Sequence, residues 1–410
     1  MSGDRRTIWI FNHYAITPDL PGGTRHFDFG KELVKRGYKV TIFASSFHHN
    51  LHKETREYTK SNYVVEDYNG VRFIWIKTFP YSSNDWRRVI NMLSYSVGAY
   101  EVAGKLDLEK PDIIIGSSVH LFAVFTAYLL SKKYKAPFVM EVRDLWPQTL
   151  IDMGMSKVHP FVVLLGILER FLYKRANRII TLLPKAHEYI EKLNIPKDKI
   201  VWIPNGVDLE RFNFSDDSIS AKHDKSSFLI TYAGSIGKAN NLDILVEVAD
   251  ILKKNYPEIK FRLVGDGPEK ERLIRLVKER SLNNVEFKGT VSKDEVAKIL
   301  YESDALILFL RNYSIYKYGI SLNKLFDYLS TGKPIIFSSN AVNNPVEEAK
   351  AGITVPPDCP KKLAEAVIML YEMPEEKRAE MGKNGRNYVE KYYSIPVLVD
   401  MLESFIKGLL

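Results

Sequence analysis

Features that define several classes of protein are missing from this 410-residue sequence. It contains a single cysteine, Cys359, which excludes an internal disulfide and favours a reducing compartment. The N-terminus does not resemble a secretion signal, and the most apolar later stretch, residues 161–167, is far shorter than the roughly 20 residues of a transmembrane helix. We therefore expect a cytoplasmic protein without a membrane-spanning segment.

The patterns of metal sites and of nucleic-acid-binding proteins are also missing. The nine histidines lack ligand spacing and no Asp-x-Asp pair lies on a suitable loop, so we expect no metal site. The net charge is +8, but the basic residues are dispersed, without a long basic run or an arginine-rich tail. An anionic nucleotide or membrane surface is therefore the expected partner, and a nucleic acid is not.

Short apolar segments alternate with amphipathic ones in two successive series, which predicts an α/β fold of two doubly wound, Rossmann-like domains. We assign residues 1–200 to an N-terminal domain and 210–393 to a C-terminal domain, with the proline-containing, polar segment 194–227 between them. The segment at 45–70 is expected to be a charged loop. Ligands of such sheets bind at the carboxyl ends of the strands, so the two domains should face each other across a cleft.

The elements expected from periodicity and length can be given as residue ranges. We expect strands at 7–11, 38–44, 71–76, 113–115, 137–142, 178–182, 229–234, 260–265, 285–288, 305–309, 334–337 and 352–355. We expect helices at 27–36, 121–134, 160–176 and 242–255.

The segment at 313–336 is the most informative part of the chain. A Gly- and Ser-containing loop at 319–321 precedes a short amphipathic helix that carries Asn323, Lys324 and Asp327. Free N–H groups at a helix N-terminus and the helix dipole both favour an anion, and Lys324 adds a positive charge. Asp327, one turn later, offers an acceptor for sugar hydroxyls. The segment therefore predicts a nucleotide-sugar site.

Glycine loops follow three other predicted strands. They carry Gly22, Gly23 and Arg25 after the first strand, Ser235 and Lys238 after the first strand of the second half, and Gly265, Asp266 and Gly267 after the next strand. Glycines allow the backbone to approach a phosphate closely. The alternative interpretation of each segment is an ordinary loop or turn.

Polar residues also follow strands of the first half. His120 closes the strand at 113–118, where a histidine can donate to a substrate hydroxyl or act as an acid or base; a satisfied structural histidine is the alternative. Arg143 and Asp144 follow the next strand and either position an acceptor or form a structural ion pair. We place His13, after the first strand, with this acceptor-binding set.

The amphipathic helix expected at 160–176 has a basic polar face. Packing against the first sheet is its default role. The alternative is peripheral contact with the anionic inner face of the cytoplasmic membrane, where a lipid-linked acceptor would be found.

Together these motifs resemble retaining GT-B glycosyltransferases of family 4, and within it the branch of bacterial surface-polysaccharide synthesis with the colanic-acid and L-fucosamine transferases. The resemblance covers nearly the whole chain. It depends on Gly22-Gly23, EVRDLWP at 141–147, NGVD at 205–208 with Phe212, YAGSIGKANNL at 232–242, GDG at 265–267 and NKLFDYLSTGKPI at 323–335.

The resemblance implies a donor held mainly by the C-terminal domain and a C-terminal helix, 394–410, that crosses back to the N-terminal domain. The donor would be a nucleotide-diphosphate sugar, with UDP favoured and an N-acetylated sugar as one candidate. The acceptor would be a glycan or a polyprenyl-diphosphate-linked glycan. Transfer would be independent of metal and other cofactors and would retain the anomeric configuration.

The motifs and the resemblance together assign three groups of site residues. The donor-binding residues are Gly22, Gly23, Arg25, Ser235, Gly265, Asp266, Gly267, Asn323, Leu325 and Asp327. The residues expected to take part in catalysis are His120, Lys238 and Lys324. The acceptor-binding residues are His13, Arg143 and Asp144.

This chain departs from the family pattern at two positions. The family has two glutamates separated by seven residues, whereas here Asp327 occupies the second position and Gly319 the first. Asn240 stands where most members have a phosphate-binding lysine, a role that Lys238 can take over. We interpret the first departure as donor specialisation.

Two other functions compete with sugar transfer. A UDP-N-acetylglucosamine 2-epimerase shares the two-domain architecture, although the helix at 323–330 fits that class poorly. A non-catalytic, sugar-nucleotide-binding partner of a polysaccharide assembly complex is the other alternative, because the first glutamate is missing.

Overall fold

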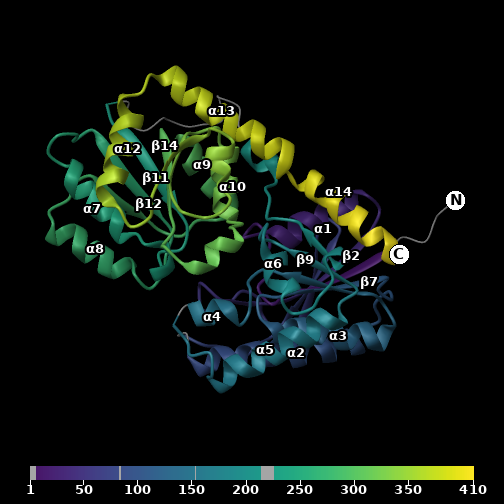
Figure 1. The fold of residues 1–410 in the computed structure, drawn as a ribbon. Helices are drawn as coiled ribbons and strands as arrows, with labels where there is room; N and C mark the ends of the chain where they lie inside the picture. Colours follow the sequence, from purple (N-terminus) through teal and green to yellow (C-terminus); the bar gives the residue numbers. More distant parts are fainter. Residues whose placement is uncertain (1–5, 83–84, 153, 214–225) are drawn as a thin grey trace.

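The computed structural model describes residues 6–82, 85–152, 154–213 and 226–410. These residues form two α/β units joined by short crossings (Figure 1). Most of the polar run that the sequence places in the connection, residues 215–227, lies outside the described residues.

The N-terminal unit is built on an eight-stranded sheet of order β10-β9-β8-β7-β1-β2-β6-β5. Every neighbouring pair is parallel except β5 and β6. The strands are β1 (Thr7–Phe11), β2 (Lys39–Ser45), β5 (Tyr63–Tyr68), β6 (Val71–Ile76), β7 (Ile113–Ser117), β8 (Phe138–Val142), β9 (Arg178–Thr181) and β10 (Ile200–Trp202). The central strands are apolar runs because helices cover both faces.

The two faces of this sheet have separate apolar cores. The helices on one face are α2 (Trp86–Lys105), α3 (Leu121–Tyr134) and α5 (Pro160–Arg175), which bury residues such as Tyr95 and Leu172 (Figure 1). The other face is covered by α1 (Arg25–Lys35) and α14 (Ile395–Ile406). Three shorter elements, α4 (Gln148–Asp152), α6 (Ala186–Glu191) and the β3–β4 hairpin (Phe47–His48 with Lys53–Glu54), lie in loops.

The C-terminal unit has a six-stranded parallel sheet of order β13-β12-β11-β14-β15-β16. Its strands are β11 (Phe228–Ala233), β12 (Ile259–Val264), β13 (Val285–Lys288), β14 (Ala305–Phe309), β15 (Ile335–Ser338) and β16 (Gly352–Val355). Its helices are α7 (Asp243–Leu252), α8 (Lys270–Glu279), α9 (Lys293–Glu302), α10 (Asn323–Ser330), α11 (Pro345–Glu348), α12 (Pro360–Glu372) and α13 (Glu375–Tyr392). The α/β prediction of two Rossmann-like parallel sheets is thereby confirmed.

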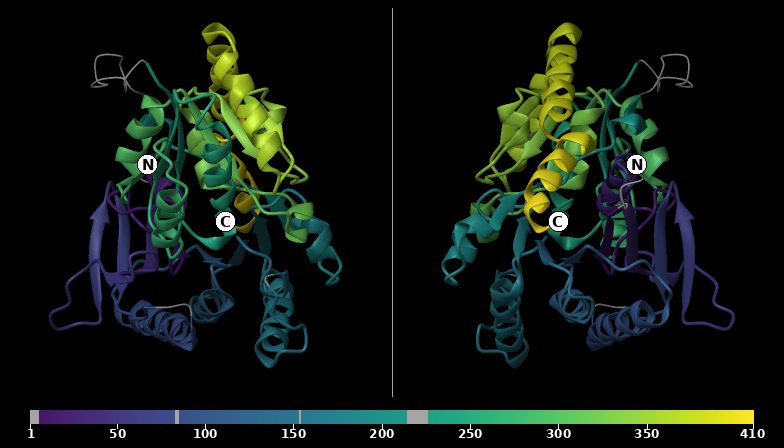
Figure 2. Two further views of the ribbon diagram at one scale, coloured as in Figure 1. Left: turned by 90° about the vertical axis from the view of Figure 1, so that its left-hand side faces the viewer. Right: turned by 90° about the vertical axis from the view of Figure 1, so that its right-hand side faces the viewer.

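The C-terminal helix α14 crosses back onto the N-terminal unit, as the sequence predicts (Figure 2). It buries Leu398 and Leu402 against the same core as α1. The guanidinium of Arg36, just after α1, donates to Asp400 at 2.6 Å and to the carbonyl of Pro396 at 3.0 Å. The crossing is therefore fixed by apolar packing and by an ionic contact.

The two chain segments that pass between the units are hydrogen-bonded to each other. The amide of Val207 donates to the Tyr393 carbonyl at 3.0 Å, and the amide of Ile395 donates to the Val207 carbonyl at 3.2 Å. A Cβ atom on Gly206 would lie 2.3 Å from the Tyr393 oxygen, so this position requires glycine. The NGVD motif at 205–208 thus forms the joint between the two units.

One expectation about the first unit is wrong. The segment at 45–70, expected to be a charged loop, contains the edge strand β5. The charged residues Glu66 and Asp67 obscure its alternation, but Glu66 accepts from the Trp75 indole at 2.7 Å. Pairing with β6 therefore overrides the polar composition of this strand.

Candidate active site

Lys324, in the first turn of α10, is a cation whose hydrogen-bond partners are neutral. Its Nζ atom donates to the hydroxyl of Tyr232 and to Oδ1 of Asn240, both at 2.9 Å, and lies 4.8 Å from the centroid of the Tyr232 ring. Burial lowers the pKa of Lys324 to about 8. An anion bound beside this ammonium group would neutralise its positive charge, which its two hydrogen-bond partners do not. Asn240, where the family has a lysine, therefore helps to hold Lys324.

The loop after β11 lies directly against Lys324. Gly234 has φ +154°, and a Cβ atom there would lie 2.7 Å from the Lys324 Nζ. Ser235 and Lys238 follow in the same loop and are exposed. The structure thus brings together the lysine and the glycine loop that the sequence assigns to a diphosphate.

The loop at 265–267 packs into the loop at 234–236. Cβ atoms on Gly265 and Gly267 would lie 2.0 Å and 2.4 Å from the carbonyl oxygens of Gly234 and Ile236. The carboxylate of Asp266 accepts from the Gly267 amide at 2.7 Å and pairs with Lys270 at 3.3 Å. The glycines are required for the contact between the loops, and the Asp266 carboxylate has local partners.

The N-terminal glycine loop reaches α10 from the opposite unit. A Cβ atom on Gly23 would lie 2.5 Å from Nδ2 of Asn323, the first residue of α10. Gly22 has φ +142° and is exposed, as is Gly23. The structure therefore places the N-terminal glycines one residue from Lys324. Leu325, by contrast, is fully buried in the C-terminal core.

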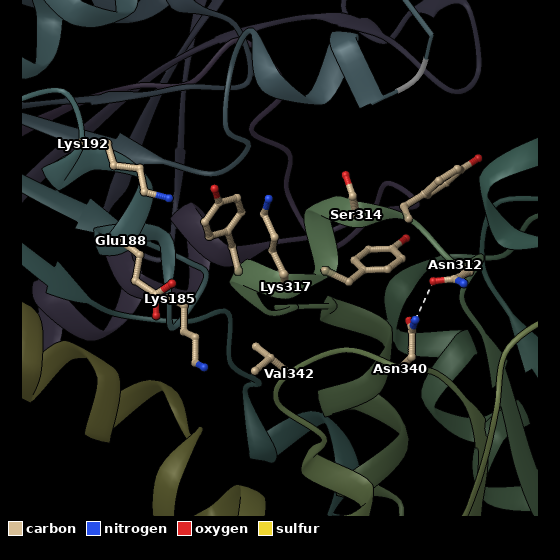
Figure 3. A pocket seen from close by; sticks show the side chains of 11 residues that line it. Lys185, Glu188, Lys192, Asn312, Ser314, Lys317, Asn340 and Val342 are labelled. Carbon is tan, nitrogen blue, oxygen red and sulfur yellow. Dashed lines mark hydrogen bonds between the residues drawn. The ribbon is translucent and has the colours of Figure 1, made fainter.

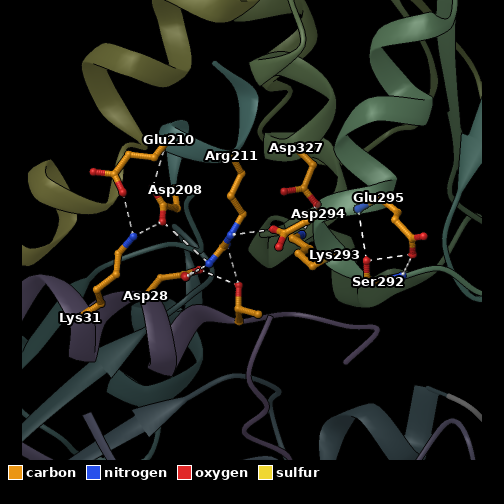
Figure 4. Close-up of polar contacts among 11 residues, drawn as sticks. Asp28, Lys31, Asp208, Glu210, Arg211, Ser292, Lys293, Asp294, Glu295 and Asp327 are labelled. Carbon is orange, nitrogen blue, oxygen red and sulfur yellow. Dashed lines mark hydrogen bonds and ion pairs between the residues drawn. The ribbon is translucent and has the colours of Figure 1, made fainter. Parts of the chain in front are cut away.

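Asp327 is buried and forms an ion pair with Lys293, at the start of α9. Figure 4 shows this pair beside Arg211, which pairs with Asp28 of α1 and lies 3.7 Å from Asp294 of α9. Asp327 is therefore part of an ionic cluster that joins the two units, and a ribose would share its carboxylate with Lys293. Lys293 and Arg211 could not be recognised from the sequence, because their partners are distant along the chain.

Arg25 does not have the role that the sequence assigns to it. It is buried, its Nε donates to Glu141 at 2.8 Å, and its other nitrogens donate to the carbonyls of Ile203, at 3.0 Å, and Pro204. These contacts occupy the guanidinium inside the N-terminal unit. The prediction that Arg25 binds the donor is therefore corrected: Arg25 has a structural role. To bind a ligand, its guanidinium would have to leave a buried ion pair, which is costly to break.

His120 and His13, at the carboxyl ends of β7 and β1, are hydrogen-bonded to each other, and the donor and acceptor of this bond can be assigned. Nδ1 of His120 accepts from the amide of Ala123 at 3.2 Å and caps α3, so a neutral ring carries its proton on Nε2. That N–H donates to Nδ1 of His13 at 2.8 Å. The proton of His13 is then on its own Nε2, a buried atom with no hydrogen-bond partner within the described residues.

Burial keeps both of these histidines neutral. It lowers the pKa of His120 to about 3, and it lowers that of His13 well below the ordinary value, with His120 adding to the effect. The His13 ring stacks on Tyr95, with centroids 4.4 Å apart and an interplanar angle of 5°. His120 was predicted to donate a hydrogen bond to the substrate, but its N–H is bonded to His13. The N–H group without a partner is therefore that of His13 Nε2.

Arg143 and Asp144 lie at the end of β8 without forming an ion pair within 4 Å of each other in the described part of the chain. The Arg143 amide donates to the Ser118 hydroxyl at 3.0 Å. Asp144 is exposed, yet the surrounding protein raises its pKa, while Arg143 and Arg88 oppose the shift. The acceptor-binding role of Arg143 and Asp144 stays a prediction.

Gly319, where the family has its first glutamate, lies against the N-terminal unit. It has φ +99°, and a Cβ atom would lie 2.5 Å from Cδ of Pro184. The two residues that follow are held by hydrogen bonds. The Ile320 amide donates to the side chain of Asn343 at 2.7 Å, and the Ser321 hydroxyl accepts from the Asn205 amide at 2.7 Å. The backbone conformation and the contact together account for glycine at this position.

Metal-ligand clusters and membrane-spanning helices are both missing from the described residues. Within the ranges that the structure describes, no group of three or more His, Cys, Asp or Glu side chains could hold a metal ion. No described helix combines the length and the apolar character needed to cross a membrane.

Comparison with known families gives two matches that together span most of the chain. Residues 22–211 match the model described as Glycosyltransferase Family 4, and residues 214–388 match the model described as Glycosyl transferases group 1. The chain is 23% identical over 300 residues to the putative colanic acid biosynthesis glycosyl transferase WcaI of Escherichia coli, covering 70% of this chain and 73% of the relative. It is 26% identical to the sulfoquinovosyl transferase of Arabidopsis thaliana, covering 80% of this chain and 62% of the relative.

Solved structures of low sequence identity share the fold. Sucrose-phosphate synthase from Thermosynechococcus elongatus superposes with a TM-score of 0.76 at 17% identity and covers 99% of both chains. HepE of Anabaena, solved in complex with UDP and glucose, gives a TM-score of 0.69 at 14% identity and covers 98% of this chain and 100% of its own. WaaG, a glycosyltransferase involved in lipopolysaccharide biosynthesis, gives 0.67 at 13% identity, with coverage of 98% and 100%.

Proposed function

Because this chain belongs to the GT-B glycosyltransferases of family 4 and group 1, we propose that it transfers a sugar from a nucleotide-diphosphate donor to a glycan acceptor with retention of configuration. The observation that carries the proposal is the environment of Lys324. A buried ammonium group with neutral partners lies between two glycine loops, one from each unit. This arrangement suits the diphosphate of a sugar nucleotide.

Lys324 would then act on the leaving group. As the bond between the anomeric carbon and the phosphate oxygen breaks, negative charge grows on the diphosphate. Lys324, Lys238 and the amides at the start of α10 would stabilise that charge, and such electrostatic stabilisation is often the largest catalytic contribution. The chemistry needs no metal ion when cations of the protein neutralise the diphosphate.

The absence of a side chain at Gly319 supports attack from the same face as the departing phosphate. A carboxylate nucleophile at this position would clash with Pro184. The acceptor oxygen would form its bond to the anomeric carbon on the face that the phosphate leaves, and the acceptor proton would pass to a phosphate oxygen. Both reactants then share one face, and the configuration is retained.

The donor is proposed to be a UDP-linked sugar, with an N-acetylated sugar as one candidate. HepE, which shares the fold, binds UDP and UDP-glucose. Asp327, held by Lys293, would accept from the ribose hydroxyls. The unpartnered N–H of His13, supported by His120, would donate to the sugar or to the acceptor.

The acceptor is proposed to be a glycan or a lipid-linked glycan at the inner face of the cytoplasmic membrane. Helix α5 exposes Val163, Leu164 and Ile167, with exposed fractions of 47%, 52% and 65%. Arg170 and Lys174 of the same helix border an apolar groove. Apolar residues with a basic rim support peripheral contact with an anionic membrane surface.

Thermal-shift screening against UDP-, GDP- and dTDP-sugars tests the donor, and product analysis tests the reaction. We expect stabilisation by UDP-sugars and a glycoside of retained configuration only when an acceptor is present. Formation of an epimer from UDP-N-acetylglucosamine alone would favour the epimerase alternative. A trapped covalent glycosyl-enzyme would contradict same-face attack.

A further inference from the structure

A cavity of about 660 Å³ opens between the two units, beside the loop that leads to Gly319 (Figure 3). Lys185, Glu188 and Lys192 line it from the N-terminal unit. The C-terminal unit contributes Lys317 and Tyr316 from the short helix Ser314–Tyr318, together with other polar residues. The cavity therefore exists only where the two units meet.

The cavity carries an excess of positive charge. Three lysines, Lys185, Lys192 and Lys317, line it with a single carboxylate, Glu188. All four side chains are exposed, and in the described part of the chain none of them forms an ion pair within 4 Å. The three lysines exceed the single carboxylate by two charges, so the cavity attracts an anion.

The remaining lining is suited to a sugar ring. Tyr313 and Tyr316 are half-buried, with ring centroids 6.1 Å apart, and present aromatic surface to the cavity. Asn312 and Asn340 hydrogen-bond to each other at its rim (Figure 3). Aromatic faces pack against the C–H groups of sugars, and amides bond their hydroxyls. A simple phosphate would use the lysines but not these groups.

One wall of the cavity is fixed across both units and belongs to the same chain segment as the candidate active site. The Lys185 amide donates to the Tyr318 carbonyl at 3.0 Å, and Gly319 packs on Pro184. The same segment continues through the loop at 319–321 into α10 and Lys324. The segment that lines the cavity is therefore also the one that presents Lys324.

We propose that this cavity binds an acidic, carboxylate-bearing sugar unit of the acceptor glycan. The proposal rests on the proposed function, since it assigns the cavity to the acceptor of that reaction. The lysines recognise the carboxylate as point charges, while the tyrosines and asparagines recognise the sugar. The acceptor would then be an acidic polysaccharide.

The test compares a trimer of galacturonic acid with its fully methyl-esterified form, which has the same backbone without the charges. Binding is measured by calorimetry on the whole protein. We expect the acid to bind about tenfold more tightly than the ester, from several exposed ion pairs. The triple variant K185Q/K192Q/K317Q should lose this preference, and rising salt concentration should reduce it in the wild type.

The matched control is K278Q/K377Q/K383Q, which removes the same charge from exposed lysines outside the cavity. It should retain the preference for the acid. Equal binding of acid and ester, or binding of neither, overturns the proposal, as does loss of the preference in the control. Equally strong competition by inorganic diphosphate would show that only charge is recognised, which also overturns it.

UDP binding is measured on the same samples to separate the two proposals. The cavity variant should bind UDP like the wild type. Failure of wild-type protein to bind UDP would count against the proposed donor site, whereas normal UDP binding without a preference for the acid would count against the cavity alone.

Discussion

The Nζ atom of Lys324 lies 2.9 Å from the hydroxyl of Tyr232 and 4.8 Å from the centroid of its ring. Tyr232 is the penultimate residue of β11, whereas Lys324 is the second residue of α10, 92 residues later. The contact fixes a cation at the point where β11, α10 and the N-terminal glycine loop converge. The hydrogen-bond acceptors of this cation are neutral, so an anionic ligand can act as its counter-ion.

Donor binding should be coupled to protonation of Lys324. The pKa of Lys324 is about 8 in the free protein because burial disfavours the charge, and a bound diphosphate will raise it. UDP binding at pH 8 should therefore take up about half a proton. Calorimetry in buffers of different ionisation enthalpy measures this uptake. Affinity should fall from pH 7 to pH 9, and a binding reaction that takes up no proton would contradict the assignment.

His13→Phe should lower kcat by more than its effect on the free energy of unfolding can explain. The substitution retains the ring stacked on Tyr95 but removes the N–H that we assign to the substrate. It also leaves the Nε2–H of His120 buried and unpaired, at a cost of about 1–3 kcal/mol. Urea unfolding and steady-state kinetics separate the two effects. A fall in stability with unchanged kcat would mean that His13 is structural.

The N-terminal unit should lose stability on mild acidification. Burial lowers the pKa of His49 and His120 to about 3, and that of His13 well below 6.5. Because the unfolded chain binds protons at higher pH than the folded protein, stability is complete above pH 6.5 and falls below it, by about 1.4 kcal/mol per pH unit for each such histidine.

Urea unfolding between pH 7 and pH 5 measures this dependence. His49→Gln should reduce the slope by the contribution of one histidine. A wild-type stability that is constant over this range would contradict the burial of neutral histidines.

Restoring a side chain at position 319 should damage the protein. Gly319→Ala forces a Cβ atom against Pro184 at φ +99°, and we expect a loss of about 2–4 kcal/mol in the free energy of unfolding. Gly319→Glu should behave no better, although it recreates the family residue. Gly289→Ala is the control, because a Cβ atom there meets nothing within 4 Å. Equal stability of the two alanine variants would refute the steric explanation.

The parts of the site encoded by local sequence could be predicted, and the parts made by distant pairing could not. The loop and helix that present Lys324 are contiguous, so their chemistry is visible in one segment. Arg25 looked like an anion-binding residue beside a glycine loop, but its partner Glu141 lies 116 residues away. The ion pair between Lys293 and Asp327 was hidden for the same reason.

The same limit applies to the fold. Apolar central strands such as β1 and β7 were predictable because burial on both faces leaves a continuous hydrophobic run. The edge strand β5 was not, since the adjacent charged residues Glu66 and Asp67 break the alternation of apolar and polar positions. The direction of the hydrogen bond from His120 to His13 required the helix cap at Ala123, which only the three-dimensional structure provides.

We propose that Lys324 binds the diphosphate of the donor, and the decisive measurement is the UDP affinity of the Lys324→Met variant at pH 7. Loss of a hydrogen bond to a charged group should weaken binding by about 10- to 100-fold. Lys377→Met, which removes an exposed lysine of α13, should bind UDP like the wild type. If Lys324→Met binds UDP as tightly as the wild type, the assignment of the donor site is wrong.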